Sequence, residues 1–441
     1  MDLSTQLKKV IALIIDIIVL YAALFLTLFL RYKEINQTII FQHLEPFSLV
    51  FFVWLIIFYI LDLYDINSFK NDVEFYRKIA AAFLVCAAVA VLFFYLVPFF
   101  AVAPKTNLFI ILIISASAMY VWRGTFNSVL NSIQPNIKLL IVGYNNIIQE
   151  LVDYISKNPQ LGYVVSFWMK EGLEDKEFNH LSQIILKNRI DVLVIPAHIK
   201  KQSRVGKLIY KNFILGIEIK DLAELYEGIF GKIPLGELQE VWFLENLKRQ
   251  HTIYDFFKKI VDFFVALAAI LVFLIPMLLI SLIILIFEGW PIIYNQGRVG
   301  EREIIFNLYK FRSMRRDAEA AGPQWSSQGD HRVNPFGKFL RKTHLDELPQ
   351  LINVLKGEIA IVGPRPERPE FVAKLREEIP FYEIRHLIKP GITGWAQTKY
   401  KYTGSIEETY EKLQYDLYYL KNRSFVVDLL IILKTMRKFF G

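Results

Sequence analysis

Two adjacent carboxylates, Asp346 and Glu347, lie in the most informative stretch of the chain, Arg341–Pro366. Arg341 begins the stretch, and a second arginine, Arg365, lies near its end in a Gly-Pro-Arg-Pro turn at Gly363–Pro366. Paired carboxylates can hold a divalent metal and supply a nucleophile. The planar guanidinium of arginine matches phosphate oxygens bidentately. Because rigid turns that carry an arginine are typical of ligand-binding loops, the stretch predicts acid chemistry beside phosphate clamps.

The spacing around the acid pair predicts its local structure. An apolar face at helical spacing is formed by Leu345, Leu348, Leu351 and Ile352. Both carboxylates are therefore expected on the polar side, near the start of a helix. Acidic residues are common there simply as partners of the helix dipole, and for the pair alone this interpretation stays open.

A basic run lies upstream of the acid pair. Lys310, Arg312 and Arg315 fall within one short segment. The run fits a phosphate clamp, because lysine and arginine both bind phosphate oxygens. A solvated basic face at a membrane surface fits it equally well, so the run alone is ambiguous.

The composition indicates a membrane protein of several domains. The chain has 441 residues, of which 54% are hydrophobic and 15% aromatic. The first part contains four apolar runs: Val10–Leu30, Phe47–Leu63, Ile79–Val102 and Leu108–Trp122. Each approaches the ~20 residues that a helix needs to cross ~30 Å of hydrocarbon. No small-residue cleavage site follows the first run, as a signal peptide would require. Residues 1–125 are therefore predicted to form a four-helix transmembrane bundle.

The basic residues predict the orientation of this bundle. They concentrate before the first run, at Lys8 and Lys9, and between the second and third, at Lys70, Arg77 and Lys78. The positive-inside rule then places both ends of the bundle in the cytoplasm. The net charge of +8 suits contact with anionic lipid. No nucleic-acid partner is expected, because the chain shows no arginine-rich tail or RNA-binding motif.

Residues 137–245 predict a Rossmann-like α/β domain. Short apolar strands alternate with helical stretches, at Ile137–Gly143, Tyr163–Trp168, Asp191–Pro196 and Gly216–Leu222. Such alternation is typical of a parallel sheet. The turn after the first strand keeps only Gly143 of the dinucleotide fingerprint, and Ile148 would crowd the contact between helix and strand. A structural or oligomerising role is therefore favoured over nucleotide binding.

A long apolar run, Ile260–Phe287, is interrupted by Pro276. It could cross the membrane, but both of its flanks are basic and both prefer the cytoplasmic side. Proline kinks a helix, and a kinked helix can enter and leave through one leaflet. The sequence therefore favours a re-entrant helix over about 259–288, although proline also occurs in spanning helices. Near the C-terminus, Phe425–Phe440 fits an interfacial helix or a buried core helix.

Several motifs in residues 250–441 together resemble the bacterial sugar transferases, the monotopic polyprenyl-phosphate hexose-1-phosphate transferases. The matching strings are KFRSM (Lys310–Met314), LRKTHLDELPQLINVLKGEIAIVGPRPE (Leu340–Glu367), KPGITGWAQ (Lys389–Gln397) and YDLYYLKN (Tyr415–Asn422). The whole layout resembles the long form of this family, with four N-terminal helices and a degenerate nucleotide-fold domain. The resemblance implies a mostly α catalytic domain over 250–441 with a re-entrant membrane helix broken at Pro276.

The resemblance also implies a reaction. Asp346 matches the family's nucleophile, which attacks the sugar-bearing phosphorus of a UDP-hexose, releases UMP and holds the sugar phosphate covalently. Undecaprenyl phosphate then takes the group and becomes undecaprenyl-diphospho-sugar, the first membrane step of O-antigen, capsule or exopolysaccharide synthesis. This places the active site on the cytoplasmic face of the bacterial inner membrane, in contact with membrane lipids.

The remaining roles follow from the same resemblance. Glu347 matches the second acid of the dyad, and with Asp346 it is a candidate ligand of Mg²⁺, the expected cofactor. The expected phosphate-binding residues are Arg341, Arg365, Lys310 and Arg312. A homodimer is a reasonable expectation, because the hydrophobic surfaces are large.

Two other classes of function compete with this one. A membrane-anchored nucleotide-sugar dehydratase or epimerase would need an intact glycine fingerprint in the middle domain, and its glycines are missing. A non-enzymatic polysaccharide assembly protein would have no use for an acid pair ringed by cations. The sequence does not distinguish glucose, galactose or an acetamido sugar as the transferred group.

Overall fold

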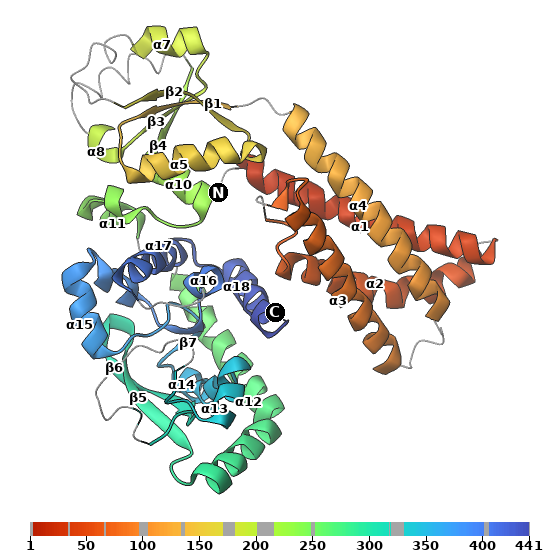
Figure 1. The fold of residues 1–441 in the computed structure, drawn as a ribbon, viewed down its shortest axis with the longest axis vertical. Helices are drawn as coiled ribbons and strands as arrows, with labels where there is room; N and C mark the ends of the chain where they lie inside the picture. The colour runs from red at the N-terminus through yellow and green to blue at the C-terminus, as the bar shows by residue number, and fades with distance from the viewer. Residues whose placement is uncertain are drawn as a thin grey trace. The chain divides into compact units, whose positions relative to one another are not determined.

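The computed structural model describes residues 3–33, 36–65, 68–96, 105–133, 137–170, 181–200, 216–247, 252–316, 318, 330–400 and 405–440. The chain folds into two compact units, Met1–Phe230 and Gly231–Gly441. Figure 1 shows the helices and strands of each unit.

The first unit begins with four long helices. These are α1 (Leu3–Tyr32), α2 (Gln37–Ile60), α3 (Val73–Leu96) and α4 (Lys105–Ile133). The end of the predicted third run, beyond Leu96, lies outside the described residues. With α12 (Thr252–Glu288) of the second unit, they are the five described helices that are long and apolar enough to cross a membrane. The structure therefore indicates a membrane-integral protein.

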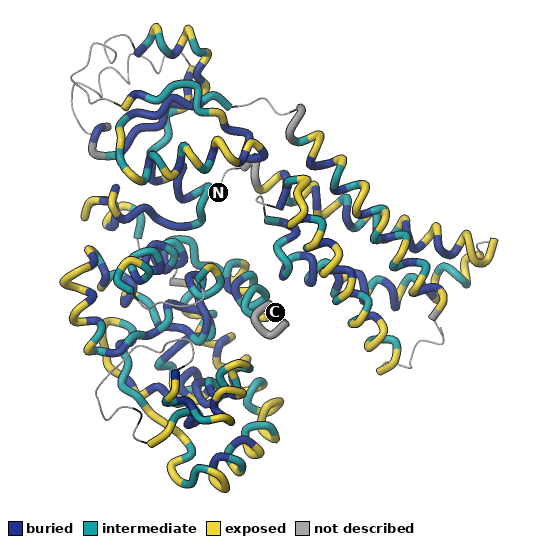
Figure 2. The backbone as a smooth tube through the Cα atoms, in the orientation of Figure 1, coloured by how far each residue is buried: buried dark blue, intermediate teal, exposed yellow. Residues whose placement is uncertain are grey.

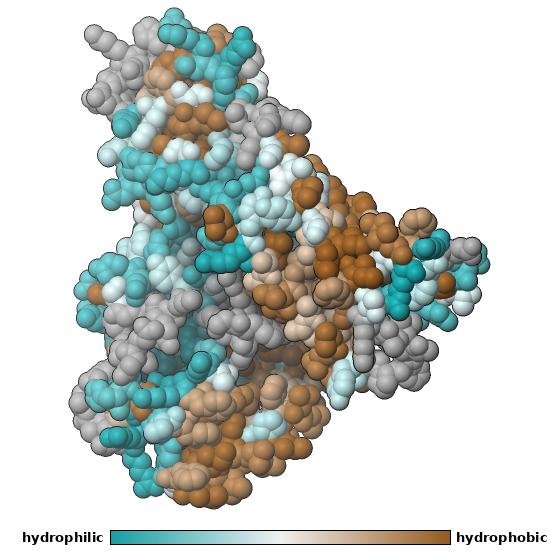
Figure 3. All heavy atoms as spheres, turned by 45° about the vertical axis from the view of Figure 1, so that its right-hand side comes forward, coloured by the Kyte–Doolittle hydropathy of each residue, from teal (hydrophilic) through white to brown (hydrophobic). Residues whose placement is uncertain are grey.

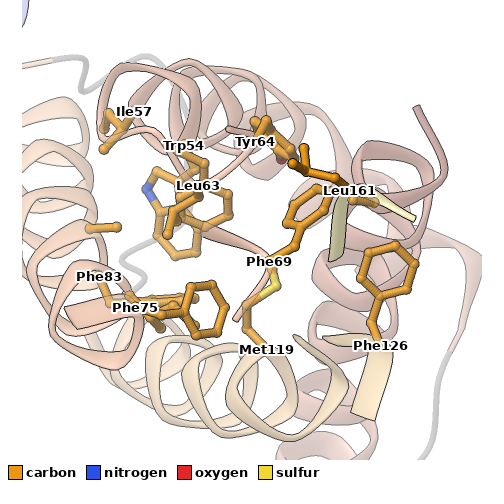
Figure 4. Packing of buried hydrophobic residues seen from close by; sticks show 14 of the residues in the cluster. Trp54, Ile57, Leu63, Tyr64, Phe69, Phe75, Phe83, Met119, Phe126 and Leu161 are labelled. Atoms are coloured by element: carbon orange, nitrogen blue, oxygen red, sulfur yellow. The ribbon is translucent and has the colours of Figure 1, made fainter. Parts of the chain in front are cut away.

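Aromatic side chains fill the interior of the helix bundle. Trp54 and Phe83 lie with their ring centroids 6.0 Å apart, and Phe69 and Phe126 lie 5.6 Å apart (Figure 4). Such edge-on contacts add to the free energy gained by burying large apolar side chains. The same core continues to Leu161 at the end of the following helical turn.

One ion pair is buried inside the bundle. Arg123 of α4 donates to Asp16 of α1 through Nη2 at 2.6 Å and through Nε at 3.1 Å. The hydroxyl of Tyr64 and the indole N–H of Trp122 also donate to this carboxylate, at 2.8 and 3.1 Å. Both charged residues are almost fully buried. These contacts repay the desolvation of the two charges and join α1, α4 and the segment after α2.

A four-stranded parallel sheet follows the bundle. Its strands, in the spatial order β2-β1-β3-β4, are β1 (Ile137–Val142), β2 (Tyr163–Met169), β3 (Val192–Ile195) and β4 (Glu218–Asp221). Helices α5 (Asn146–Lys157), α7 (Leu181–Asn188), α8 (Ala197–Lys200) and α10 (Leu222–Phe230) accompany them. The strands thus follow the segments that the alternation predicts.

The turn after β1 is filled by side chains of the unit itself. Gly143 has a φ of +98°, a conformation that favours glycine. A Cβ atom at this position would lie 3.4 Å from Cδ1 of Ile148. The indole N–H of Trp168 donates to the Gly143 carbonyl at 2.8 Å, and the ring of Tyr144 stacks on that indole. Ile148 is 1% exposed, so its side chain is buried beside this turn.

The second unit combines helices with two small sheets. Strands β5 (Ile293–Val299) and β6 (Ile305–Phe311) form an antiparallel hairpin, and β7 (Ala360–Val362) and β8 (Gly391–Thr393) pair in parallel. The main helices besides α12 are α13 (Pro335–Lys342), α14 (Gln350–Leu355), α15 (Pro369–Glu378), α17 (Ile406–Asn422) and α18 (Phe425–Phe440). The 3₁₀ turn η5 (Leu345–Glu347) carries both predicted acids.

Both halves of helix α12, before and after Pro276, pack against the rest of the second unit. Before Pro276, Ala266 and Ile270 contact a core that contains Leu308 of β6. After it, Ile284 contacts a second core that contains Phe311. The helix bends along its length (Figure 1), as an internal proline allows.

The opposite face of α12 is apolar and exposed. The most apolar 18 residues of α12 are only 11% buried, whereas the corresponding stretches of α1–α4 are 28–50% buried. Exposed residues run along the helix in Figure 2, and hydrophobic residues cover that part of the surface in Figure 3. An apolar face of this size would be costly in water, so α12 indicates a surface that enters lipid.

The buried ion pair of the bundle can be tested by removing one partner. We expect Arg123→Leu to lower the free energy of unfolding by about 3–5 kcal/mol, because Asp16 is then buried without its charged partner. Thermal unfolding of the purified protein in detergent measures the loss. Glu74→Gln is the control, since its pair with Lys78 on α3 is exposed and contributes little. Equal effects of the two substitutions would contradict this account.

Candidate active site

The hairpin β5–β6 delivers Lys310 to the acid pair. Residue-by-residue antiparallel pairing runs from Ile293 opposite Phe311 to Val299 opposite Ile305. This pairing fixes the direction of Lys310 near the end of β6. The pairing also places Phe311 in the core with Leu340 of α13. Leu345 and Leu348, next to the two acids, pack against the same core.

The turn η5 begins at a residue with left-handed backbone. His344 has φ +55° and ψ +15° and precedes Leu345 directly. A residue other than glycine adopts this conformation only when its surroundings impose it. Leu345 and Leu348 then pack into the core below α12. The strained residue and the two leucines together fix the direction in which Asp346 and Glu347 leave the turn.

The loop that carries Arg365 is fixed by a close backbone approach. A Cβ atom on Gly363 would lie 2.5 Å from the Lys389 carbonyl, so only glycine fits between β7 and β8. Its N–H donates to the Thr393 carbonyl at 2.8 Å. Because β7 ends one residue earlier, Arg365 leaves the sheet from a rigid base.

Glu347 lies between two cations. Lys310 Nζ is 2.8 Å from Glu347 Oε1. Arg365 donates to the same oxygen through Nη2 and approaches Oε2 through Nη1 at 3.5 Å. The side chain of Glu347 is 12% exposed. The structure thus brings Asp346, Glu347, Lys310 and Arg365 together from three separate segments, β6, η5 and the loop after β7.

The two acids of this site have opposite pKa shifts. Burial raises the pKa of Asp346 above its usual 3.8, and the charge of Glu347 adds to the shift, while Lys310, Arg341 and Arg365 oppose it. Burial would also raise the pKa of Glu347. The charges and hydrogen bonds of Arg365 and Lys310 outweigh it and hold that pKa well below the usual 4.5. Divergent pKa values in neighbouring acids indicate different roles.

The other predicted site residues lie in different surroundings. Arg341 donates from Nε to Ser313 Oγ at 3.0 Å, and its charge acts on Asp346. Arg312 instead donates to the carbonyls of Glu288 and Gly289, both at 2.7 Å. It therefore caps the carboxyl end of α12, where a cation is favoured. Pro276 lies inside α12, as described above.

Comparison with known proteins identifies this unit. The sequence model of the family described as bacterial sugar transferase matches residues 253–441. The "Exopolysaccharide production protein PSS" of Rhizobium leguminosarum bv. phaseoli is 37% identical over 185 residues, which are 41% of this chain and 92% of that protein. The chain belongs to the bacterial sugar transferase family.

Two other relatives match a larger part of this chain than the Rhizobium protein does. A "UDP-N-acetylgalactosamine-undecaprenyl-phosphate N-acetylgalactosaminephosphotransferase" of Aeromonas hydrophila is 39% identical over 221 residues, 50% of this chain and 52% of that protein. A "UDP-glucose:undecaprenyl-phosphate glucose-1-phosphate transferase" of Xanthomonas campestris pv. campestris is 27% identical over 322 residues, 69% of this chain and 66% of that protein. The chain thus spans 52% and 66% of their lengths.

Further charged residues around the candidate site were not predicted from the sequence. Arg298 Nη1 donates to the Pro366 carbonyl at 3.0 Å, and Arg385 Nη2 donates to the Arg365 carbonyl at 2.8 Å. Lys412 binds Glu367 at 2.9 Å, and the pKa of Glu367 is about 2, because Lys412, Arg385 and Arg298 outweigh the effect of burial. These contacts fix the loop after β7 through the backbone carbonyls of Arg365 and Pro366 and the side chain of Glu367.

The ion pairs of Glu347 predict a pH-dependent stability. A lowered folded-state pKa contributes stability that is fully present above the unfolded value, near 4.5, and is lost as the pH falls through the folded value. At pH 7 we expect Glu347→Gln to lower the melting temperature by roughly 5–10 °C, since two cations lose their partner.

This difference between wild type and Glu347→Gln should shrink when the pH falls below 4.5. Thermal unfolding in detergent at several pH values measures it. Glu370→Gln is the control, because Glu370 is exposed. A difference that stayed constant over the whole pH range would show that Glu347 is not held ionised.

Proposed function

We propose that the protein transfers a sugar 1-phosphate from a UDP-hexose to undecaprenyl phosphate and releases UMP. The observation that carries the proposal is the buried Asp346 beside a Glu347 that Lys310 and Arg365 hold ionised. The names of the relatives from Aeromonas and Xanthomonas supply the substrate classes. The Rhizobium relative's name supplies the pathway, exopolysaccharide production.

Asp346 is the nucleophile of the proposed reaction. One carboxylate oxygen attacks the sugar-linked phosphorus of the UDP-sugar and forms a new P–O bond. The bond from that phosphorus to the bridging oxygen breaks, and UMP leaves with the electron pair. An oxygen of undecaprenyl phosphate then attacks the same phosphorus, and the carboxylate of Asp346 leaves. The product is undecaprenyl-diphospho-sugar, and a carboxylate acts similarly in the aspartyl-phosphate ATPases.

The cations around Glu347 stabilise the charge of the moving phosphoryl group. Glu347 occupies only some of the N–H groups of Lys310 and Arg365, because these side chains carry three and five donors. The remaining donors are available to phosphate oxygens, and Arg341 adds a further positive charge next to Asp346. Donors that are held in place before the substrate arrives need no reorganisation during the reaction.

The residues present also fit Mg²⁺. In proteins this ion is commonly bound by one or two carboxylates together with substrate phosphates. The described residues contain no group of three or more His, Cys, Asp or Glu side chains that could hold a metal, so the diphosphate would have to complete the coordination. Asp346 and Glu347 would hold the ion, and it would neutralise charge on the diphosphate.

We further propose that α1–α4 cross the inner membrane and that α12 is re-entrant, so that the site faces the cytoplasm. Both ends of α12 are bound to the same unit. Lys258 pairs with Asp428 at 2.6 Å near its start, and Arg312 binds the Glu288 carbonyl at its end. Helix α12 has 37 residues, each of which rises ~1.5 Å. It is therefore longer than a single crossing, which needs about 20 residues.

Asp346→Asn tests the nucleophile. We expect it to abolish UMP release from UDP-sugars by the purified protein with undecaprenyl phosphate, a loss of at least ~10³-fold, because an amide cannot form the acyl phosphate. The measurement is UMP release over a panel of UDP-hexoses and UDP-acetamido sugars. Asp153→Asn is the matched control, since Asp153 is exposed on α5 of the first unit, where it accepts a hydrogen bond from Gln149 Nε2. Equal release by Asp346→Asn and wild type would remove Asp346 as the nucleophile.

Labelling of introduced cysteines tests the topology. Ile253→Cys and Ile304→Cys lie before and after the apolar part of α12, and both positions are exposed. In a Cys86→Ala background we expect a membrane-impermeant maleimide to reach both only from the cytoplasmic side, because the flanks of α12 are basic. Gln37→Cys, at the start of α2, is the control for the opposite side. Labelling of positions 253 and 304 from opposite sides would show a fifth crossing.

A further inference from the structure

A buried polar cluster joins α12 to α17 and α18. Asp428 of α18 accepts from Tyr254 Oη at 2.7 Å and from Lys258 Nζ at 2.6 Å, both on Oδ2. Its other oxygen, Oδ1, accepts from Tyr419 Oη of α17 at 2.8 Å. Asp428 is 7% exposed and Tyr419 is 1% exposed. The Asp428 carboxylate on α18 thus accepts hydrogen bonds from the start of α12 and from α17.

The cluster also reaches the strand that leads to Arg365. Tyr419 Oη lies 3.2 Å from the Val362 carbonyl oxygen, and Val362 is the last residue of β7. From the other side, Asp262 of α12 accepts a hydrogen bond from the Ile361 backbone. Gly363 and Pro364 alone separate this strand end from Arg365. A shift of β7 would therefore move the guanidinium that holds Glu347.

We infer that Tyr419 is a positioning residue for Arg365, an inference that rests on the function proposed above. The hydroxyl has one hydrogen, which is shared between Asp428 Oδ1 and the Val362 carbonyl. Asp428 fixes the hydroxyl, and the hydroxyl fixes the end of β7. Through Tyr254 and Lys258 the position of Arg365 depends on how α12 is seated in its domain.

The charges facing the cluster support this order of dependence. Lys258 also lies 3.6 Å from Asp262, so one lysine serves both carboxylates that act on β7. Since such a cluster is costly unless every member is paired, its geometry has little freedom.

Tyr419→Phe tests the inference, because it removes only the hydroxyl. We expect kcat for UMP release to fall about tenfold with the KM for the UDP-sugar changed less than about twofold, as for a misplaced group that acts in the transition state. In an Arg365→Lys background the same substitution should cost less than about threefold, because residues that act as a unit are not additive. Tyr400→Phe is the control, since that hydroxyl binds Glu411.

Several outcomes would overturn the inference. An equal fold loss from Tyr419→Phe in both backgrounds would show that Tyr419 does not act through Arg365, and so would an unchanged kcat. Should Tyr419→Phe fail to fold, Tyr254→Phe removes one donor to Asp428 and must show the same non-additivity with Arg365→Lys. A wild type that releases no UMP from any UDP-sugar would instead refute the proposed function, so the two failures are distinguishable.

Discussion

The ionic contact of Glu347 with Lys310 and Arg365 is the constraint on which the site depends. It is largely buried, and charges of this kind are stable in a protein interior only when their partners are held in place. The three residues come from β6, from η5 and from the loop after β7. Each of those segments therefore has to be fixed independently, by hairpin pairing, by the left-handed His344 and by the close contact of Gly363.

In the proposed arrangement, the same unit also fixes the depth of the site relative to lipid. The exposed face of α12 is apolar, while its other face packs on the cores that support Lys310 and η5. If α12 is embedded in lipid as proposed, it cannot move without moving Lys310 and η5. This arrangement suits a reaction between a water-soluble donor and a lipid phosphate, because both substrates must meet at one depth.

The sequence predicted those parts that depend on local spacing. It indicated the four-stranded alternation of the middle domain, the C-terminal helix Phe425–Phe440 and the neighbourhood of Asp346 and Glu347. It gave Lys310 and Arg312 the same phosphate-binding role, since alternate residues of an extended strand share one face. β6 ends at Phe311, so only Lys310 follows the strand and Arg312 turns to α12. Arg385 and Tyr419 were missed because helical spacing does not reveal contacts with a distant loop.

The distribution of partners gives the two acids different electrostatic surroundings, as the proposed reaction requires. Glu347 attracts the nearest cations, so its charge is neutralised within the protein and its pKa is low. Asp346 receives their influence only at longer range, and burial raises its pKa. A carboxylate that is poorly compensated is a stronger base and a better nucleophile than one that two cations neutralise. If Lys310 or Arg365 paired with Asp346 instead, the same residues would form a stable ion pair in place of the nucleophile of the proposed reaction.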